Sequence, residues 1–160
     1  MRNSFVWDRL VSQIAFECGQ LEKLIEFYRP VMMKCAQAEP EPLEVANLSG
    51  MLHSFYSGVE NVFKRIALEL DGDLPSGPSW HSELLTAMFR AGPTRSGVIS
   101  APLAARLKDY LAFRHVFRSA YAFLLTWSRM EPLVMDCEAT LRQFRQELES
   151  FVRSGHRGEA

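Results

Sequence analysis

The sequence has few cysteine and histidine residues and no excess of either charge. Its 160 residues include three cysteines, four histidines, 18 basic and 19 acidic side chains, for a net charge of −1. An odd number of widely spaced cysteines argues against a disulfide framework or a zinc ribbon, so we expect Cys18, Cys35 and Cys137 to be reduced and buried. Because the charges balance, binding of a polyanion requires a local basic patch.

A long uninterrupted hydrophobic run is also missing. The most apolar stretch, residues 110–127, contains Arg114 and Arg118, so we expect no membrane span. Charged residues interrupt the apolar ones within the first nine residues before a hydrophobic region can form, so this segment does not resemble a signal peptide. No two of the four histidines have metal-ligand spacing with a cysteine or a carboxylate, and we expect neither a metal nor another cofactor. Together with reduced cysteines, these features predict a cytoplasmic protein.

What the sequence does contain is helical periodicity. Hydrophobic residues recur at three- and four-residue steps in four long segments, and no segment alternates with a period of two. Proline and glycine separate the segments. The predicted helices cover residues 6–38, with Pro30 inside, 42–70, a short one over 80–90 capped by Ser79, 101–127 capped by Ser100, and 132–153, opened by Pro132.

Short connections between these helices predict their arrangement. The 48% apolar residues suffice for a hydrophobic core, and 160 residues is the size of one ordinary domain. We therefore predict an all-α fold, an antiparallel four-helix bundle with one additional short helix. One domain is expected over residues 1–154, followed by a flexible C-terminal tail over residues 155–160.

The predicted helix over residues 101–127 carries an arginine in its inward-facing register. At about 100° per residue, Arg118 lies ~40° and Tyr121 ~20° from Arg114, so the three polar side chains share one face. His115 and Ser119 pair four residues apart on an adjacent face. Arg114 either reaches solvent or makes one buried ion pair, as long basic side chains often do, or it binds an anion.

Basic residues gather on this helix although the whole chain is neutral. Residues 106–129 hold five basic side chains and one acid, Asp109, and aromatic residues are interleaved with them. Cations that bind phosphate and rings that stack on bases are the chemistry of an RNA-contacting surface. The basic residues are Arg106, Lys108, Arg114, Arg118 and Arg129, of which we expect Arg106, Lys108 and Arg118 to bind RNA around Arg114.

Residues 111–123, Leu-Ala-Phe-Arg-His-Val-Phe-Arg-Ser-Ala-Tyr-Ala-Phe, resemble the signature of the HEPN superfamily, in particular the HepT-like ribonuclease toxins. Their motif is arginine, four residues, histidine, any residue, tyrosine. Residues 52–60 and 74–85 are also similar to the corresponding segments of HepT-like proteins. The resemblance implies a helical bundle, usually a homodimer, that acts as a metal-independent endoribonuclease toxin. It further implies a nucleotidyltransferase antitoxin that modifies the motif tyrosine, here Tyr121.

One motif position differs from the family pattern. Arg114 and Tyr121 match, but the histidine expected five residues after Arg114 is Ser119, and the polar residue after the arginine is His115. By resemblance, Arg114 stabilises charge on the scissile phosphate and Tyr121 orients it. A serine hydroxyl cannot titrate near neutrality as an imidazole does, so Ser119 predicts a weakened nuclease. His115 could replace the missing histidine if the helix is distorted.

The other histidines are expected to lie outside the site. His53 shares a polar helix face with Ser57, Glu60 and Lys64 and is interpreted as solvated or capping. His81 is expected at the surface in the first turn of the short helix. His156 falls in the C-terminal tail.

Three functions remain open from the sequence. The first is a HepT-like endoribonuclease that acts on RNA. The second is a non-catalytic HEPN-like binding protein that is the partner or substrate of a nucleotidyltransferase. The third is a helical bundle with a structural role only. Arg114, Tyr121 and the local basic patch favour the first two.

Overall fold

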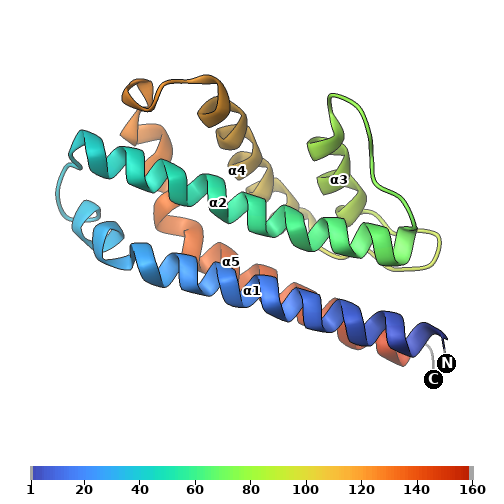
Figure 1. The fold of residues 1–160 in the computed structure, drawn as a ribbon. Helices are drawn as coiled ribbons and strands as arrows, with labels where there is room; N and C mark the ends of the chain where they lie inside the picture. Colours follow the sequence, from blue (N-terminus) through green and yellow to red (C-terminus); the bar gives the residue numbers. More distant parts are fainter. Residues whose placement is uncertain (1, 159–160) are drawn as a thin grey trace.

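The computed structural model describes residues 2–158, which form five α-helices and no β-strand (Figure 1). The all-α prediction is confirmed. A π-helical turn follows the second helix and a 3₁₀ turn follows the fourth. The elements are α1 (Arg2–Cys35), α2 (Pro42–Ile66), η1 (Ala67–Asp71), α3 (Trp80–Phe89), α4 (Ala101–Ser119), η2 (Ala122–Leu124) and α5 (Trp127–Arg157).

Helix α2 lies at the centre of the bundle and contacts α1, α3, α4 and α5. In Figure 1, α1 lies on one side of α2 and α3 and α4 lie on the other, while α5 starts near the end of α4, crosses behind α2 and runs along α1, so that the start of α1 and the end of α5 lie at the same end of the bundle. Much of the hydrophobic core therefore comes from α2, with Leu48, Phe55 and Phe63 at 0% exposure. The predicted antiparallel four-helix bundle with one extra short helix is confirmed.

Local signals explain several helix ends. Pro42 occupies the first turn of α2, where its missing N–H costs nothing, and the Glu41 backbone N–H donates to the Glu44 carboxylate at 2.9 Å. Gly72, with φ 77°, ends η1 in a left-handed conformation that favours glycine. Ser100 caps α4 as predicted, because its Oγ accepts from the Leu103 N–H at 3.3 Å.

Helix α4 ends eight residues earlier than predicted. It stops at Ser119, and Ala120 is extended, with ψ 148°. The Ser119 hydroxyl donates to the carbonyls of His115 (2.9 Å) and Val116 (3.3 Å), which satisfies the last turn locally. No glycine or proline marks this break, and the hydrophobic periodicity continues through it. The end of the helix could therefore not be predicted from the sequence. Tyr121 consequently lies outside the helix and does not share a helix face with Arg114.

Helix α5 is longer than predicted at both ends. It begins at Trp127, so Pro132 lies inside the helix instead of opening it. At the other end it continues to Arg157, through the first residues of the expected tail. Gly155 leaves room there for the Trp7 indole of α1, and the His156 ring lies 5.8 Å from that indole, so packing against α1 extends the helix. Residues 159–160 of that tail lie outside the described residues.

Helix α3 is joined to η1, the turn after α2, by the buried side chain of Arg95, which lies in the loop after α3. Arg95 donates from Nε and Nη2 to the two carboxylate oxygens of Asp71, both at 2.7 Å, and from Nη2 to the Ala87 carbonyl at 3.1 Å. Ser79 occupies the predicted N-cap position of α3, but its side chain makes no capping bond. The arginine therefore fixes the short helix that carries His81.

The cysteines are buried and unpaired, as expected. Burial raises the pKa of the Cys18 thiol to about 11 and also raises the pKa of Cys137, so both remain protonated at neutral pH. Of the helices that the structure describes, none has the length and apolarity needed to cross a bilayer.

Candidate functional site

Three helices bring Glu60, His81 and Arg114 together in one buried polar cluster. Arg114 Nη1 of α4 donates to Glu60 Oε1 of α2 at 2.9 Å. The other carboxylate oxygen, Glu60 Oε2, lies 2.6 Å from His81 Nδ1 of α3. The side chains of Glu60, His81 and Arg114 are 3%, 9% and 14% exposed. Of the alternatives left open for Arg114, the structure shows the buried ion pair, with Glu60 as its partner.

The 2.6 Å contact assigns the proton on His81. A carboxylate oxygen only accepts hydrogen bonds, so Nδ1 must carry the hydrogen and donate to Glu60. The Arg114 Nη1 atom, 3.1 Å from Nδ1, is then a neighbour of that nitrogen and donates to the carboxylate instead. Glu60 thus accepts from both His81 and Arg114, and its buried charge is compensated.

Neighbouring aromatic rings hold His81 in place. Trp80 stacks on the imidazole with ring centroids 3.6 Å apart, and Lys64 Nζ lies 4.8 Å from the Trp80 ring centroid. His115 contacts the imidazole edge-on at 5.8 Å. His115 is itself exposed on α4. We expected His81 at the surface, and this was wrong, because the pairing with Glu60 and the stacking on Trp80 draw the ring inward.

A third histidine lies beside the cluster. His53 of α2 packs against Phe117 of α4 with ring centroids 5.0 Å apart. Burial and the positive charges of Arg114 and Arg118 lower the pKa of His53, so the ring is neutral at pH 7. Three of the four histidines in the chain therefore surround Arg114. The polar face of α2 that we interpreted as solvated is instead turned toward α3 and α4.

Several polar atoms near Arg114 are buried without a hydrogen-bond partner. Among the described residues they include His53 Nδ1, the Tyr56 hydroxyl and Arg114 Nε. Burial and the negative charge of Glu60 raise the pKa of Tyr56, so this hydroxyl remains protonated. Arg114 Nη2 and His81 Nε2 make no hydrogen bond within the described residues, and neither is among the buried atoms. Neither nitrogen is therefore completely buried, although the two side chains as a whole are only 14% and 9% exposed.

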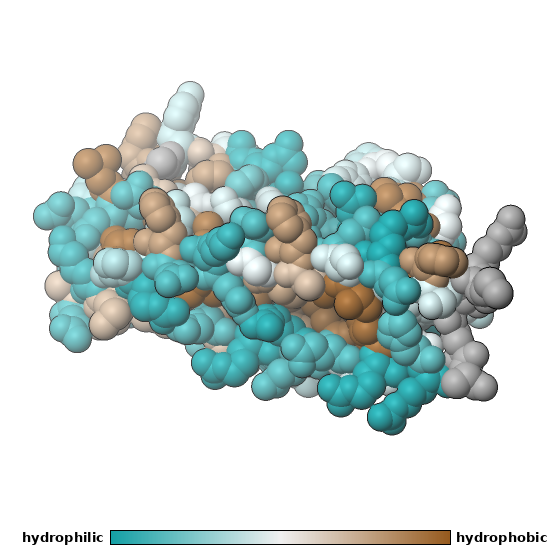
Figure 2. All heavy atoms as spheres, turned by 60° about the horizontal axis from the view of Figure 1, so that its bottom comes forward, coloured by the Kyte–Doolittle hydropathy of each residue, from teal (hydrophilic) through white to brown (hydrophobic). Residues whose placement is uncertain are grey.

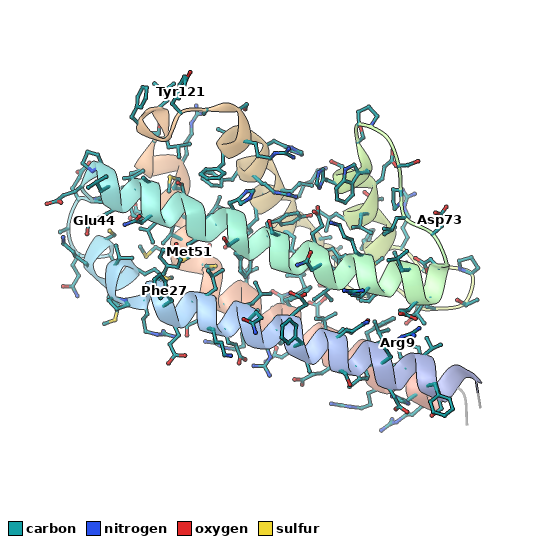
Figure 3. All side chains as sticks on the ribbon, in the orientation of Figure 1. Arg9, Phe27, Glu44, Met51, Asp73 and Tyr121 are labelled. Carbon is teal, nitrogen blue, oxygen red and sulfur yellow. The ribbon has the colours of Figure 1, made fainter. Side chains whose placement is uncertain are left out.

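The residues predicted around Arg114 are only partly gathered there. Arg118 is exposed one helical turn away, close enough to affect His53. Tyr121 is 72% exposed in the connection between α4 and α5, and its ring stacks on Phe123. Figure 3 shows Tyr121 pointing away from the bundle beyond the end of α4. Ser119 is exposed, and its hydroxyl bonds only to carbonyls of its own helix.

The remaining predicted RNA-binding residues lie on other faces of α4. Lys108 is exposed about 120° around the helix from Arg114, and Arg106 lies about 80° away. The Arg106 guanidinium is directed to α5, where Nη1 lies 3.5 Å from Gln143 Oε1. The basic residues of α4 therefore form no single surface with Arg114; Arg118 is the one closest to it in angle.

Sequence reasoning missed Glu60 and His81 as partners of Arg114. His53, Tyr56 and Glu60 follow the i, i+3, i+7 spacing of one helix face, and this is a signal in the sequence. A polar stripe on an otherwise buried helix could therefore have indicated a site. The position of His81 could not be predicted from spacing, because α3 reaches the cluster only through the tertiary fold.

Comparison with known protein families assigns the chain to one of them. A family model described as HepT-like protein matches residues 47–154, which contain α3, α4 and most of α2 and α5. The chain belongs to the HepT-like family. A search with this chain found no match among the curated proteins or the solved structures. The matched region includes every residue of the Arg114 cluster, whereas α1 lies outside it.

Proposed function

We propose that this protein is a metal-independent endoribonuclease, the toxin component of a toxin–antitoxin pair, with Arg114 at the scissile phosphate. The proposal is supported by Nη2 of Arg114, which makes no hydrogen bond within the described residues and lies among three histidines. A guanidinium binds phosphate oxygens well, and imidazoles transfer protons near neutral pH. Membership of the HepT-like family supports the same chemistry.

The pairing with Glu60 orients Arg114 for this role. Nη1 is held by the carboxylate, which restricts the guanidinium and leaves Nη2 without a hydrogen bond within the described residues. A donor positioned in advance stabilises the charge that develops on phosphate oxygens, because little reorganisation is needed during the reaction. The weakening expected from Ser119 is compensated in this proposal by the imidazoles around Arg114.

Cleavage of a fluorescent RNA in excess EDTA tests the proposal. Wild type should cleave, and Arg114→Lys, which keeps the charge but loses the planar fork, should be slower by at least about tenfold. Arg142→Ala, an exposed arginine of α5, is the control and should retain the wild-type rate. Equal rates for wild type and Arg114→Lys would contradict a role for Arg114 at the phosphate.

A second candidate function is supported by the exposure of Tyr121. We propose that the protein is the partner and substrate of a nucleotidyltransferase that modifies this hydroxyl, whether or not RNA is cleaved. A side chain that is 72% exposed in a turn can enter the active site of another enzyme without unfolding of the bundle. The added phosphate would bring negative charge near the basic end of α4.

Mass spectrometry after coexpression with a nucleotidyltransferase encoded beside this chain tests the second candidate. The adduct is expected on Tyr121 and should disappear in Tyr121→Phe. Tyr28, which is partly buried against the core, should remain unmodified. An adduct on another residue, with Tyr121 unmodified, would refute the assignment.

A further inference from the structure

We propose that His81, held by Glu60, is the general base that takes the proton from the attacking 2′-hydroxyl of RNA. This inference rests on the proposed ribonuclease function and names a residue outside the Arg114–Tyr121 motif. His81 and Arg114 approach each other from α3 and α4, with Nδ1 and Nη1 3.1 Å apart. In this proposal the two nitrogens that make no hydrogen bond within the described residues, Nε2 and Nη2, act on one phosphodiester and its neighbouring ribose.

The carboxylate selects the form of His81 that a base requires. Glu60 accepts from Nδ1–H at 2.6 Å, so the neutral ring has its lone pair on Nε2, the nitrogen without a hydrogen bond within the described residues. After Nε2 takes up a proton, the same carboxylate stabilises the imidazolium. A carboxylate that fixes a histidine in this way is a positioning group and does not itself transfer a proton.

Of the three histidines around Arg114, His81 is the one that has this support. His115 is exposed, and no carboxylate contacts it among the described residues. His53 is partly buried beside two arginines, and its Nδ1 has no hydrogen-bond partner. Stacking on Trp80 and the edge-on contact with His115 fix the ring plane of His81 as well. A general base needs such a fixed geometry before its pKa becomes relevant.

The proposed step is transesterification. Nε2 of His81 removes the proton of the 2′-hydroxyl, whose oxygen forms a new bond to phosphorus while Arg114 Nη2 donates to a non-bridging oxygen. The bond from phosphorus to the 5′-oxygen breaks, and this oxygen leaves with the electron pair and takes a proton from water. The products are a 2′,3′-cyclic phosphate and a 5′-hydroxyl, and His81 returns its proton to solvent.

Charged and titratable groups face His81 from two other helices. From α2 these are Glu60, which contacts the ring directly, and Lys64, which lies over Trp80. From α4 they are Arg114 and His115. The cleavage rate should rise with pH as an imidazole loses its proton. If His81 is the base, removal of His81 abolishes this rise, while His115 and His53 remain in place.

The experiment measures single-turnover RNA cleavage in EDTA between pH 5 and 9. The variants are His81→Gln, Glu60→Gln, Arg114→Lys and, as a matched control, His156→Gln, whose ring packs against Trp7. Circular dichroism gives the folded fraction of each. We expect His81→Gln to lower the cleavage rate by about 10²- to 10⁴-fold and to abolish the rise of the rate with pH on the acidic side of the profile, the acidic limb. Glu60→Gln should cleave more slowly but keep this limb, and His156→Gln should behave as wild type.

A His81→Gln variant that keeps the wild-type rate and acidic limb, while Arg114→Lys is impaired, overturns this inference and leaves the proposed function standing. A wild type that cleaves no RNA overturns both. Because His81→Gln can also affect folding, ¹⁵N NMR of the wild type provides a second test. The neutral His81 ring should carry its proton on Nδ1, and a proton on Nε2 would overturn the assignment.

Discussion

At the scale of single residues, the most informative contact is the ion pair between Arg114 and Glu60. A carboxylate with 3% exposure is stable only while its charge is compensated, so Arg114 contributes to the fold as well as to the site. Removal of the guanidinium would leave a buried carboxylate without its cationic partner.

Urea denaturation of single and double variants measures this contribution. Arg114→Ala should lower the free energy of unfolding by about 3 kcal/mol, as expected for a broken buried pair. In a Glu60→Gln background the same change should cost less than about 1 kcal/mol, because no buried charge remains to be paired. Equal losses in both backgrounds would mean that the two side chains are not coupled.

A second prediction at this scale concerns the titration of His53. Burial and the charges of Arg114 and Arg118 lower its pKa in the folded state, so the unfolded chain takes up the proton first. The contribution of His53 to stability is therefore present above about pH 6.5 and declines as the pH falls toward the folded-state pKa.

NMR titration of His53 checks this sign. Its pKa should lie below the usual value for histidine, and it should rise in Arg118→Gln, which removes one nearby charge from an exposed position. Lys108→Gln, on another face of α4, is the control and should leave the titration unchanged. A His53 pKa that is insensitive to Arg118 would contradict the arrangement of α2 and α4.

At the scale of helices, the sequence predicted which elements form and missed where two of them end. Hydrophobic periodicity and proline or glycine signals are local, so the helical segments and the Ser100 cap could be predicted from them. The break after Ser119 has no such signal. The start of α5 at Trp127, five residues before Pro132, also has no local signal and could not be predicted. Because α4 ends at Ser119 and α5 begins at Trp127, Tyr121 lies in the connection between them.

Close packing of α1 on α2 gives a prediction at this scale. A Cβ atom on Gly58 would lie 2.5 Å from Leu21 Cδ2, and Leu21 is buried. Gly58→Ala should therefore destabilise the protein by about 1–3 kcal/mol, the usual cost of overpacking. Gly50 lies on the same helix with nothing within 4 Å of its Cβ position, so Gly50→Ala should stabilise by about 0.5–1 kcal/mol.

Thermal or urea denaturation of the two variants decides between these effects. Opposite signs are expected, since both positions have helical backbones and differ in the space around them. If both variants were stabilised, the contact between α1 and α2 would be looser than described.

At the scale of the whole molecule, exposed hydrophobic residues offer a surface for the homodimer expected from the sequence. Figure 2 shows the face that carries α1 as mostly hydrophilic, with hydrophobic groups among the hydrophilic ones. Around the end of α4, four apolar side chains that are close together in sequence, those of Val116, Tyr121, Phe123 and Leu124, are 51–79% exposed. If the protein is a homodimer, we expect this patch to form its interface.

Sedimentation at micromolar concentration tests this proposal. The expected mass is about 37 kDa, twice the 18.3 kDa of one chain. Phe123→Glu should give a monomer, whereas Phe16→Glu on the outer face of α1 should remain dimeric. A monomeric wild type, or a dimer that tolerates Phe123→Glu and is dissociated by Phe16→Glu, would contradict the proposed interface.

If Arg114 and the histidines around it form one RNA site, a bound RNA should affect them together. NMR with a 2′-O-methyl RNA, which lacks the attacking hydroxyl and stays intact, measures this effect. The side-chain signals of Arg114, His81 and His53 should shift together on titration, whereas those of His156 should not. RNA binding that shifts Arg106 and Lys108 but leaves Arg114 and His81 unchanged would show that the RNA binds elsewhere.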